Sequence, residues 1–185
     1  MKRQVSRELK VHPSKIHRLF YPQVPAVLST ISGGRVSAMP VVSYAAVSTS
    51  PPLVIVACDP RSFTLQLALD SRAFSLSILG KSKVKAVEKL AVESGRRVRD
   101  KLYACGLAHS RGAELDIPVL RNAEATLECE VRSGRRLGDH VLLVGVVRAC
   151  RASKKFKGSW NFERYRPILY TGWKAGLTTY EGADS

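Results

Sequence analysis

The stretch Ala125-Thr126-Leu127-Glu128-Cys129-Glu130-Val131-Arg132 decides the fold class of this chain. Its apolar residues alternate strictly with its polar residues, so in an extended chain the two sets lie on opposite faces. This pattern predicts a β-strand with one buried face. A loop rich in Gly and Arg is expected at 133–139. The apolar stretch Val141 to Ala149 follows, and we expect it to pair with the first strand as a long hairpin.

Other segments also have strand character. Val24 to Ser32 is rich in β-branched residues and ends at Gly33-Gly34, a dipeptide suited to the positive φ of a tight hairpin turn. Arg35 to Ser43 is expected to return as its partner. Further strands are predicted at Leu53 to Cys58, Ala73 to Leu79 and Pro167 to Trp173.

Helical signals are fewer. Ser82 is expected to cap a helix from Lys83 to Glu93, whose apolar residues share one face, and Gly95 is expected to stop it. Ser62 is expected to cap a shorter helix that runs to Asp70. A third helix is expected at Pro13 to Phe20. Many strands with few helices predict a mainly β, antiparallel barrel with peripheral helices.

The composition is that of a folded but strongly basic protein. The chain has 185 residues, of which 30 are Lys or Arg and 15 are Asp or Glu, and its formal net charge is +15. Hydrophobic residues make up 45%, which is globular composition rather than that of a disordered basic tail. No repeat or linker divides the sequence. We therefore expect one domain over 1–185, with a basic N-terminal extension or helix at 1–20.

Several classes of protein are disfavoured. No apolar stretch reaches the roughly 18 residues that a membrane helix needs, and no signal peptide is visible, so a cytoplasmic location is expected. Gly80-Lys81-Ser82 lacks the first glycine of a phosphate-binding P-loop. The histidines have no metal-ligand spacing, so no metal site is expected. Small core residues are the expected role of the four cysteines, with a structural bridge left open: Cys58, Cys105, Cys129 and Cys150.

Hydroxyl groups gather in the middle of the N-terminal half. They belong to Ser37, Ser43, Tyr44, Ser48, Thr49, Ser50, Ser62 and Thr64. The sharpest part is Asp59-Pro60-Arg61-Ser62-Phe63-Thr64, because a helix that begins at Ser62 presents free backbone N–H groups and a positive dipole end. A guanidinium and two hydroxyls stand beside it. This describes a phosphate site, and an ordinary helix cap explains the same residues, so both interpretations remain open.

A series of motifs resembles a known family in order and spacing from about Tyr21 to Tyr180. The motifs are Pro25-Ala26-Val27-Leu28-Ser29-Thr30, Gly33-Gly34, Ser43-Tyr44-Ala45-Ala46-Val47-Ser48-Thr49-Ser50-Pro51-Pro52-Leu53-Val54, Ser62-Phe63-Thr64, Phe74-Ser75-Leu76-Ser77-Ile78-Leu79 and Gly138-Asp139-His140. Together they resemble the flavin reductase-like, flavoredoxin-type FMN-binding split β-barrels. The resemblance implies a homodimer of split barrels, with FMN bound by each barrel near the subunit interface.

The resemblance also implies a set of cofactor-binding residues. It puts Ser37, Ala38, Met39 and Pro40 beside the isoalloxazine ring, Ser43, Tyr44 and Ser48 near the ring edge and ribityl chain, and Ser62, Phe63 and Thr64 near the phosphate, next to Arg61. Ser37 and Ser77 stand where many relatives have Asn, and a hydroxyl replaces only part of the hydrogen bonding of a carboxamide.

His140 is the one candidate catalytic residue. In relatives the Gly-Asp-His element lies close to the flavin and nicotinamide pocket, so the resemblance gives His140 a role in positioning nicotinamide or delivering protons. The alternative is a histidine at the start of a strand with a satisfied hydrogen bond. Both remain open.

Three functions follow from these observations. The favoured one is an NAD(P)H-dependent flavin or ferric reductase that passes hydride from nicotinamide to FMN, with NADH or NADPH as co-substrate and a small molecule or protein as electron acceptor. The second is an FMN-containing electron carrier that a partner protein reduces. The third is a basic nucleic-acid-binding barrel, suggested by clusters of cations such as Arg132, Arg135 and Arg136, although the same charge also suits a solvated surface or the steering of anionic ligands. The preferred nucleotide and the acceptor are not predicted.

Overall fold

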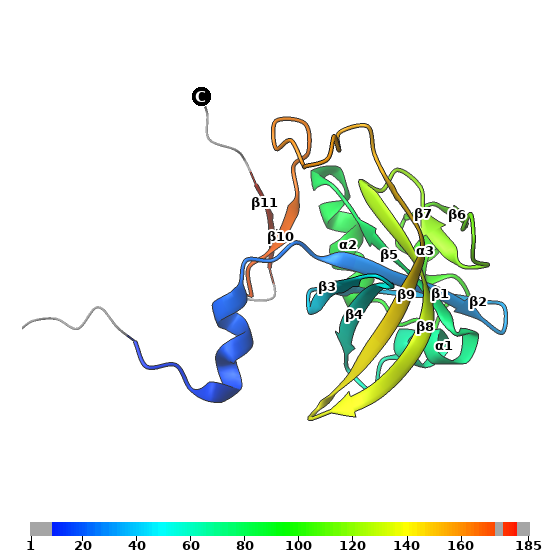
Figure 1. The fold of residues 1–185 in the computed structure, drawn as a ribbon, viewed down its shortest axis with the longest axis horizontal. Helices are drawn as coiled ribbons and strands as arrows, with labels where there is room; N and C mark the ends of the chain where they lie inside the picture. Colours follow the sequence, from blue (N-terminus) through cyan, green and yellow to red (C-terminus); the bar gives the residue numbers. More distant parts are fainter. Residues whose placement is uncertain (1–8, 173–175, 181–185) are drawn as a thin grey trace, which may run out of the picture.

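The computed structural model describes residues 9–172 and 176–180. Its main sheet has seven strands in the order β2-β1-β5-β8-β9-β4-β3, and every neighbouring pair is antiparallel (Figure 1). The strands are β1 (Ala26–Ser32), β2 (Arg35–Val41), β3 (Tyr44–Thr49), β4 (Pro52–Cys58), β5 (Ala73–Ile78), β8 (Ala125–Leu137) and β9 (His140–Ala152).

The sheet wraps around a core that all its central strands share. Leu28 of β1, Val56 of β4, Phe74 of β5 and Leu143 of β9 are fully buried in this core. The two edge strands, β2 and β3, are consecutive in the sequence and only two residues apart. Between these edges the barrel is split, because no ladder within the described residues joins β2 to β3. The predicted antiparallel barrel with peripheral helices is therefore confirmed.

A second core lies on the other face of β1 and β2. Because side chains alternate along a strand, Val27 points away from the barrel interior and packs with Val87 and Leu90 of helix α2 (Val84–Val92). The short helix α3 (Lys101–Ala104) adds Leu102 to the same cluster. Helix α1 (Phe63–Ser71) instead contributes to the barrel core.

The N-terminal segment forms an arm beside the barrel (Figure 1). It contains a 3-10 helix, η1 (Pro13–Phe20), at the predicted position, and none of the residues of this helix is buried. Backbone hydrogen bonds of 3.1 and 2.7 Å join Gln23 to Tyr170 and connect the base of the arm to strand β10 (Ile168–Tyr170). The remaining elements are η2 (Lys81–Lys83), β6 (His109–Arg111), β7 (Pro118–Leu120) and β11 (Leu177–Thr179).

The predicted loop at 133–139 is wrong. Strand β8 continues to Leu137, and the turn consists only of Gly138 and Asp139. Gly138 has a φ of +60°, a value that suits the first central position of a two-residue hairpin turn. The arginines that suggested a loop are strand residues, because the hairpin extends beyond the barrel and both of its faces reach solvent there.

The prediction that Ser82 caps the long helix is also wrong. A 3-10 turn at Lys81–Lys83 comes first, α2 begins at Val84, and Lys83 is its N-cap residue without a side-chain capping bond. The backbone N–H of Lys81 donates to the carbonyl of Arg166. This long-range bond holds residues 81–83 in the 3-10 turn, so the α-helix begins two residues after Ser82. The helix ends at Val92, before the predicted Glu93. The predicted end of the last strand, at Trp173, lies outside the described residues.

Three of the four cysteines occupy the core positions expected of them. Cys58, Cys105 and Cys129 are buried, Cys150 is exposed, and all four are free thiols. In the part of the chain that the structure describes, no helix is long and apolar enough to cross a membrane.

Candidate functional site

A cleft of about 770 Å³ opens where the barrel is split. The end of β2, with Met39, Pro40 and Val41, and its connection to β3, with Val42 and Ser43, form its floor. One wall is the end of β4 with Ala57, Cys58 and Asp59, and another is the hairpin turn with Asp139 and His140. The arm closes the remaining side with Pro13, Ser14, Ile16, His17 and Tyr21. The seam between the two edge strands thus becomes a concave site.

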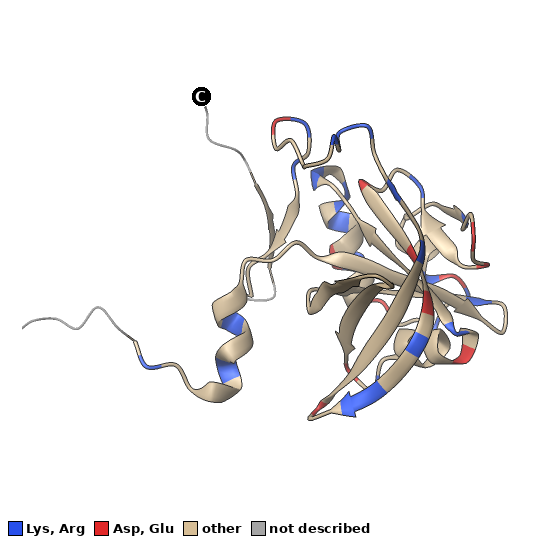
Figure 2. Ribbon diagram, in the orientation of Figure 1, with Lys and Arg blue, Asp and Glu red and all other residues tan. Residues whose placement is uncertain are grey.

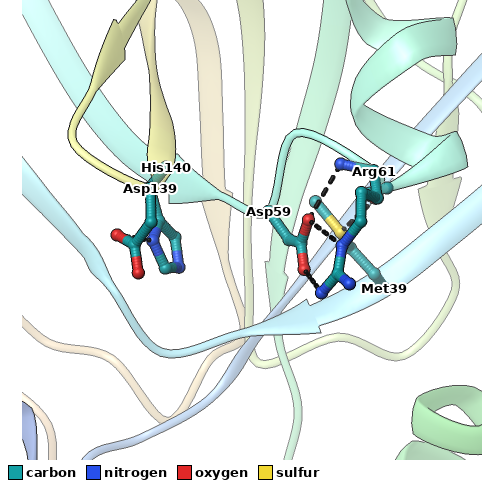
Figure 3. Close-up of polar contacts among 6 residues, drawn as sticks. Met39, Asp59, Arg61, Asp139 and His140 are labelled. Atoms are coloured by element: carbon teal, nitrogen blue, oxygen red, sulfur yellow. Dashed lines mark hydrogen bonds and ion pairs between the residues drawn. The ribbon is translucent and has the colours of Figure 1, made fainter.

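An ion pair marks the end of β4 at the edge of this cleft (Figure 3). The Arg61 guanidinium donates to both carboxylate oxygens of Asp59, through Nε at 3.1 Å and Nη2 at 2.7 Å, and the Arg61 backbone N–H donates at 2.8 Å. These hydrogen bonds from Arg61 lower the pKa of Asp59 to about 2. Arg61 is nevertheless mostly exposed, so its outward side stays accessible to an anion.

Helix α1 begins as the sequence predicts. Ser62 is the N-cap residue, and its hydroxyl oxygen accepts the N–H of Leu65 at 3.3 Å. The same hydroxyl donates to the sulfur of Met39 at 3.0 Å, which connects the start of the helix to the floor of the cleft. The first N–H groups of a helix have no partner within the helix, so the start of α1 carries a partial positive charge. Because Ser62 follows Arg61 directly, this positive end lies beside the Asp59–Arg61 pair.

Three predicted site residues near this helix start are buried, one on α1 and two on β2. Thr64 is buried, and its hydroxyl lies 2.9 Å from the hydroxyl of Ser37, which is fully buried. Ala38 is fully buried as well. The bond between Ser37 and Thr64 fastens α1 to β2. None of these three side chains presents surface to a ligand in this arrangement.

Two arginines flank the ring of Phe63 at the first position of α1. The guanidinium carbons of Arg35 and Arg96 lie 5.6 and 4.8 Å from the ring centroid. Arg96 also donates to the side chain of Gln66 at 3.0 Å, while Arg35 donates to three backbone carbonyls of the loop at 95–98. Sequence reasoning missed Arg96 here, because only folding brings the 95–98 loop next to the start of α1.

On the opposite wall, Asp139 and His140 form a hydrogen-bonded pair (Figure 3). Nδ1 of His140 lies 2.8 Å from Oδ1 of Asp139, and this hydrogen bond lowers the pKa of Asp139. About half of the His140 side chain is exposed. Because the carboxylate engages Nδ1, Nε2 is the ring nitrogen left for a ligand in the cleft.

Smaller clefts adjoin the main one. A cleft of about 320 Å³ shares His17, Tyr21, Val42, Ser43 and Ala57 with it, and its wall includes Tyr44. The Tyr44 hydroxyl donates to the carbonyl of Val24 at 2.8 Å, and burial raises its pKa. Tyr44 therefore supports the wall as a neutral hydrogen-bond donor.

The predicted site residues therefore separate into groups. Met39, Pro40, Ser43 and His140 line the main cleft, and Tyr44 lines the adjoining one. Arg61, Ser62 and Phe63 lie around the start of α1 at the cleft edge, whereas Ser37, Ala38 and Thr64 are buried beneath it. Ser48 stands further along β3 and is not among the residues that line the cleft.

Asp59 and the arm residues were not predicted as site residues. Asp59 belongs to the motif that the sequence singled out, so its ion pair with Arg61 was within reach of sequence reasoning. The arm residues had no such signal, since their contribution depends on where the arm lies.

The arrangement suits a partly apolar ligand with an anionic end. Met39, Pro40 and Val42 provide apolar surface, and Ser43 and His140 provide polar groups. The start of α1 provides partial positive charge at one edge, beside the Asp59–Arg61 ion pair. The cleft volume of about 770 Å³ lies within the 300–1,000 Å³ that small-molecule sites typically have. Across the described residues, no three His, Cys, Asp or Glu side chains gather in a way that holds a metal ion.

Two comparisons with solved and curated proteins agree with this geometry. The FMN-binding protein of Thermus thermophilus, solved with bound 1-cyclohex-2-enone, is 31% identical, with a TM-score of 0.77 and coverage of 97% of both chains. StyB, an NADH-dependent flavin reductase of Pseudomonas fluorescens, is 30% identical over 132 residues, which are 71% of this chain and 72% of that protein.

The match extends beyond these two proteins. An Aeropyrum pernix protein without a functional name is 31% identical over 158 residues, or 85% of this chain, and the match spans only 60% of the length of that relative. The model of the flavin reductase like domain matches residues 17–171, which include the barrel, η1 from His17 onward and the cleft except for Pro13, Ser14 and Ile16 of the arm. This chain therefore belongs to the flavin reductase-like domain family.

Proposed function

We propose that this protein is an NAD(P)H-dependent flavin reductase that binds FMN in the main cleft. The observation that carries the proposal is the coincidence of three features at the seam of the barrel: an apolar floor, a helix start beside the Asp59–Arg61 pair, and a histidine on the opposite wall. Membership of the flavin reductase-like family supports it, as does the similarity to an FMN-binding protein and to an NADH-dependent reductase.

The residues present fit FMN in two parts. Met39 and Pro40 offer apolar surface for the isoalloxazine ring, and Ser43 offers a hydroxyl for its polar edge. The start of α1 at Ser62, with Arg61 and Arg96 nearby, offers the positive charge that a phosphate needs. Because Ser37, Ala38 and Thr64 are buried, we assign them the support of β2 and α1 rather than direct contact.

FMN, when bound, supplies the hydride-accepting chemistry. The protein residues have the task of holding the nicotinamide over the ring in an aligned pose. His140 is suited to this task because its side chain lines the cleft and Asp139 orients its ring. Hydride transfer is sensitive to position, since reacting atoms must approach to about 3–3.5 Å.

A homodimer is part of the proposal. Successive side chains of a strand point to opposite faces of the sheet. Because every second residue of β4 and β9 points into the barrel core, the residues between them lie on the outer face. That outer face is continuous and apolar, and its side chains are exposed or half-buried in the isolated chain: Ala45, Leu53, Ile55, Ala57, Leu142, Val144 and Val146. A second copy packed there would cover it and would border the cleft through Ala57. A cytoplasmic location belongs to the same proposal.

The decisive test is the absorbance spectrum of the FMN-loaded protein before and after anaerobic addition of NADH or NADPH. We expect a flavin spectrum that bleaches with one or both nucleotides. If neither nucleotide bleaches bound flavin, the protein is an electron carrier reduced by a partner. If FMN does not bind at all, the flavin proposal is wrong.

The position of the phosphate can be tested separately with Ser62→Ala. Loss of the cap lowers the stability of the protein by roughly 0.5–2 kcal/mol. Any loss of affinity that follows from this destabilisation is the same for FMN and for riboflavin. The phosphate-specific effect appears as a ratio: we expect FMN affinity to fall several-fold more than riboflavin affinity, because riboflavin has no phosphate. Equal losses in the two titrations would place the phosphate elsewhere.

A further inference from the structure

Two adjacent arginines near the tip of the β8–β9 hairpin point in opposite directions. In the register of the hairpin, Arg135 is opposite Leu142 and Arg136 is opposite Val141. Directly opposed residues share a face of the sheet, and successive residues alternate between faces. Arg135 therefore shares the face of Leu142, and Arg136 shares the face of Val141.

The two faces have different surroundings. A Cβ placed on Gly134 would lie 2.7 Å from Leu69 and 3.7 Å from Val141, so the face of Arg136 is the one turned toward α1. The other face carries His140, which lines the 770 Å³ cleft, and Leu142, which lines the 320 Å³ cleft and belongs to the outer face proposed for the dimer, so this face meets the clefts at the border of that contact. Arg135 thus stands on the cleft side of the hairpin.

The two arginines also differ in their hydrogen bonds. Arg136 donates through Nε to the carbonyl of Gly138 at 3.2 Å, within its own turn. No carboxylate of the described residues forms an ion pair with Arg135, and its side chain is exposed. Figure 2 shows positive charge along this end of β8, beyond the body of the barrel.

The distance between Arg135 and His140 along their shared face matches the distance from the nicotinamide ring of a nucleotide to its nearest phosphates. Arg135 is the diagonal cross-strand neighbour of His140, and such neighbours lie about 7–8 Å apart. The phosphates of a nicotinamide nucleotide are one ribose away from the nicotinamide ring. A guanidinium on its long side chain can therefore reach those phosphates when the ring lies beside His140, and its planar fork suits phosphate oxygens.

We propose that Arg135 binds the phosphate groups of the nicotinamide nucleotide and so determines the affinity for NAD(P)H. The inference rests on the proposed reductase function and names a residue of its substrate site. Arg135 positions the dinucleotide and does not contact the atoms that exchange hydride. Its contribution belongs to binding, so it is expected in KM rather than in kcat.

The experiment compares Arg135→Ala with Arg136→Ala, the same substitution one residue further along the strand and on the opposite face. Steady-state kinetics with NADH and NADPH give KM and kcat, and equilibrium titrations of the oxidised, FMN-loaded proteins with NAD⁺ and NADP⁺ give dissociation constants without turnover. We expect Arg135→Ala to raise KM and the dissociation constants at least about tenfold, with kcat changed less than twofold. We expect Arg136→Ala and the FMN affinity of both variants to stay within twofold of the parent.

Each other outcome has a defined meaning. Equal effects of the two substitutions would show general charge attraction and overturn the proposal, as would no effect of Arg135→Ala on a parent protein that the nucleotides do reduce. Failure of the parent protein to be reduced would instead overturn the reductase function. Equal losses for NADH and NADPH would support contact with the pyrophosphate, whereas a loss confined to NADPH would place Arg135 at the 2′-phosphate on the adenosine ribose and overturn the placement of the nicotinamide ring beside His140.

Discussion

Among single residues, His140 shows how a weak sequence signal gains meaning from its surroundings. In the sequence it is a histidine after a glycine and an aspartate. In the structure it follows a two-residue turn, bonds through Nδ1 to Asp139 at 2.8 Å, and faces Asp59 across the cleft (Figure 3). The pKa of Asp59 is lowered mainly by the Arg61 hydrogen bonds, and the electrostatic contribution from the side of His140 is the smallest of the causes. These contacts place it where it can position a ligand.

We therefore expect His140→Ala to leave FMN affinity nearly unchanged and to slow reduction by NAD(P)H at least about tenfold, which corresponds to roughly 1.4 kcal/mol of transition-state stabilisation. The physical reason is the proposed role of the imidazole, which is to position the nucleotide and not to hold the flavin. Stopped-flow reduction of the FMN-loaded variant measures the rate. An unchanged rate would remove His140 from the site.

Gly145 is a second residue whose role depends on tertiary contacts. It lies in the buried part of β9, and a Cβ there would be 2.6 Å from the tip of the Phe74 ring. We expect Gly145→Ala to destabilise the protein by about 1–3 kcal/mol, because the well-packed barrel core has no room for the methyl group. Urea unfolding measures the change in the free energy of unfolding.

A compensating substitution tests that explanation. Phe74→Leu removes the ring atoms that the new methyl group would meet. The double variant is expected to be more stable than the sum of the two single effects allows. Strict additivity would show that Gly145 is required for another reason.

Among the elements, strand β8 holds a distant loop through one buried carboxylate. Glu128 is 3% exposed, and its oxygens accept the backbone N–H groups of Ala113, Glu114 and Leu115 at 2.8, 2.9 and 3.0 Å. Burial acts to raise the pKa of Glu128, but the three donors outweigh burial, so the pKa lies below its ordinary value. The loop is thus fastened to the sheet by an ionised group.

We expect Glu128→Gln to lower the free energy of unfolding by roughly 1.5–3 kcal/mol at pH 7, the value of hydrogen bonds to charged groups. A depressed folded-state pKa stabilises the fold above the unfolded value of about 4.3, and this contribution is lost as the pH falls through the folded value. The difference between parent and variant should therefore shrink in urea titrations below pH 4.

Glu130→Gln is the matched control on the same strand. Glu130 is about half exposed and pairs with Arg148 at the surface, so we expect an effect below about 1 kcal/mol. If both variants lose the same stability, or if the Glu128→Gln difference does not depend on pH, the loop is not held by the carboxylate charge.

On the scale of the whole molecule, the outer face of β4 and β9 leaves apolar surface that the isolated chain does not bury. We expect the parent protein to sediment as a dimer and Ile55→Lys to sediment as a monomer, because the lysine would place a charge in the proposed contact. FMN affinity should fall with dissociation, since the same face borders the cleft.

Tyr103→Lys is the control for this experiment. Tyr103 is 81% exposed on α3, on another part of the surface, and its replacement should leave the dimer intact. A parent protein that is monomeric at every concentration would refute the dimer and leave the cleft itself untested by this variant. A dimer that persists in Ile55→Lys would move the interface to a different face.

Much of the fold could be predicted from the sequence because its determinants are local. Alternation of apolar and polar residues along 125–131 specifies a strand with one buried face, and Gly33 and Gly34 have the positive φ values that their hairpin turn requires. Ser62 caps α1 because a short hydroxyl side chain satisfies an N–H three residues ahead. Each of these depends on residues that are close in the chain.

Tertiary structure decided what depends on distant partners. Whether Arg135 and Arg136 lie in a loop or in a strand was settled by pairing with β9, and whether Thr64 meets a ligand or Ser37 was settled by the packing of α1 on β2. The start of α2 was settled by a backbone bond from Lys81 to Arg166. The sequence by itself determined six of the seven strands of the main sheet, the Gly33-Gly34 turn and the family, since local sterics and alternation act within a few residues, whereas β3, β6, β7 and β11 were not predicted. The cleft exists only after folding, because its floor, its walls and the arm come from four separate segments, and the arm and the hairpin turn are more than a hundred residues apart.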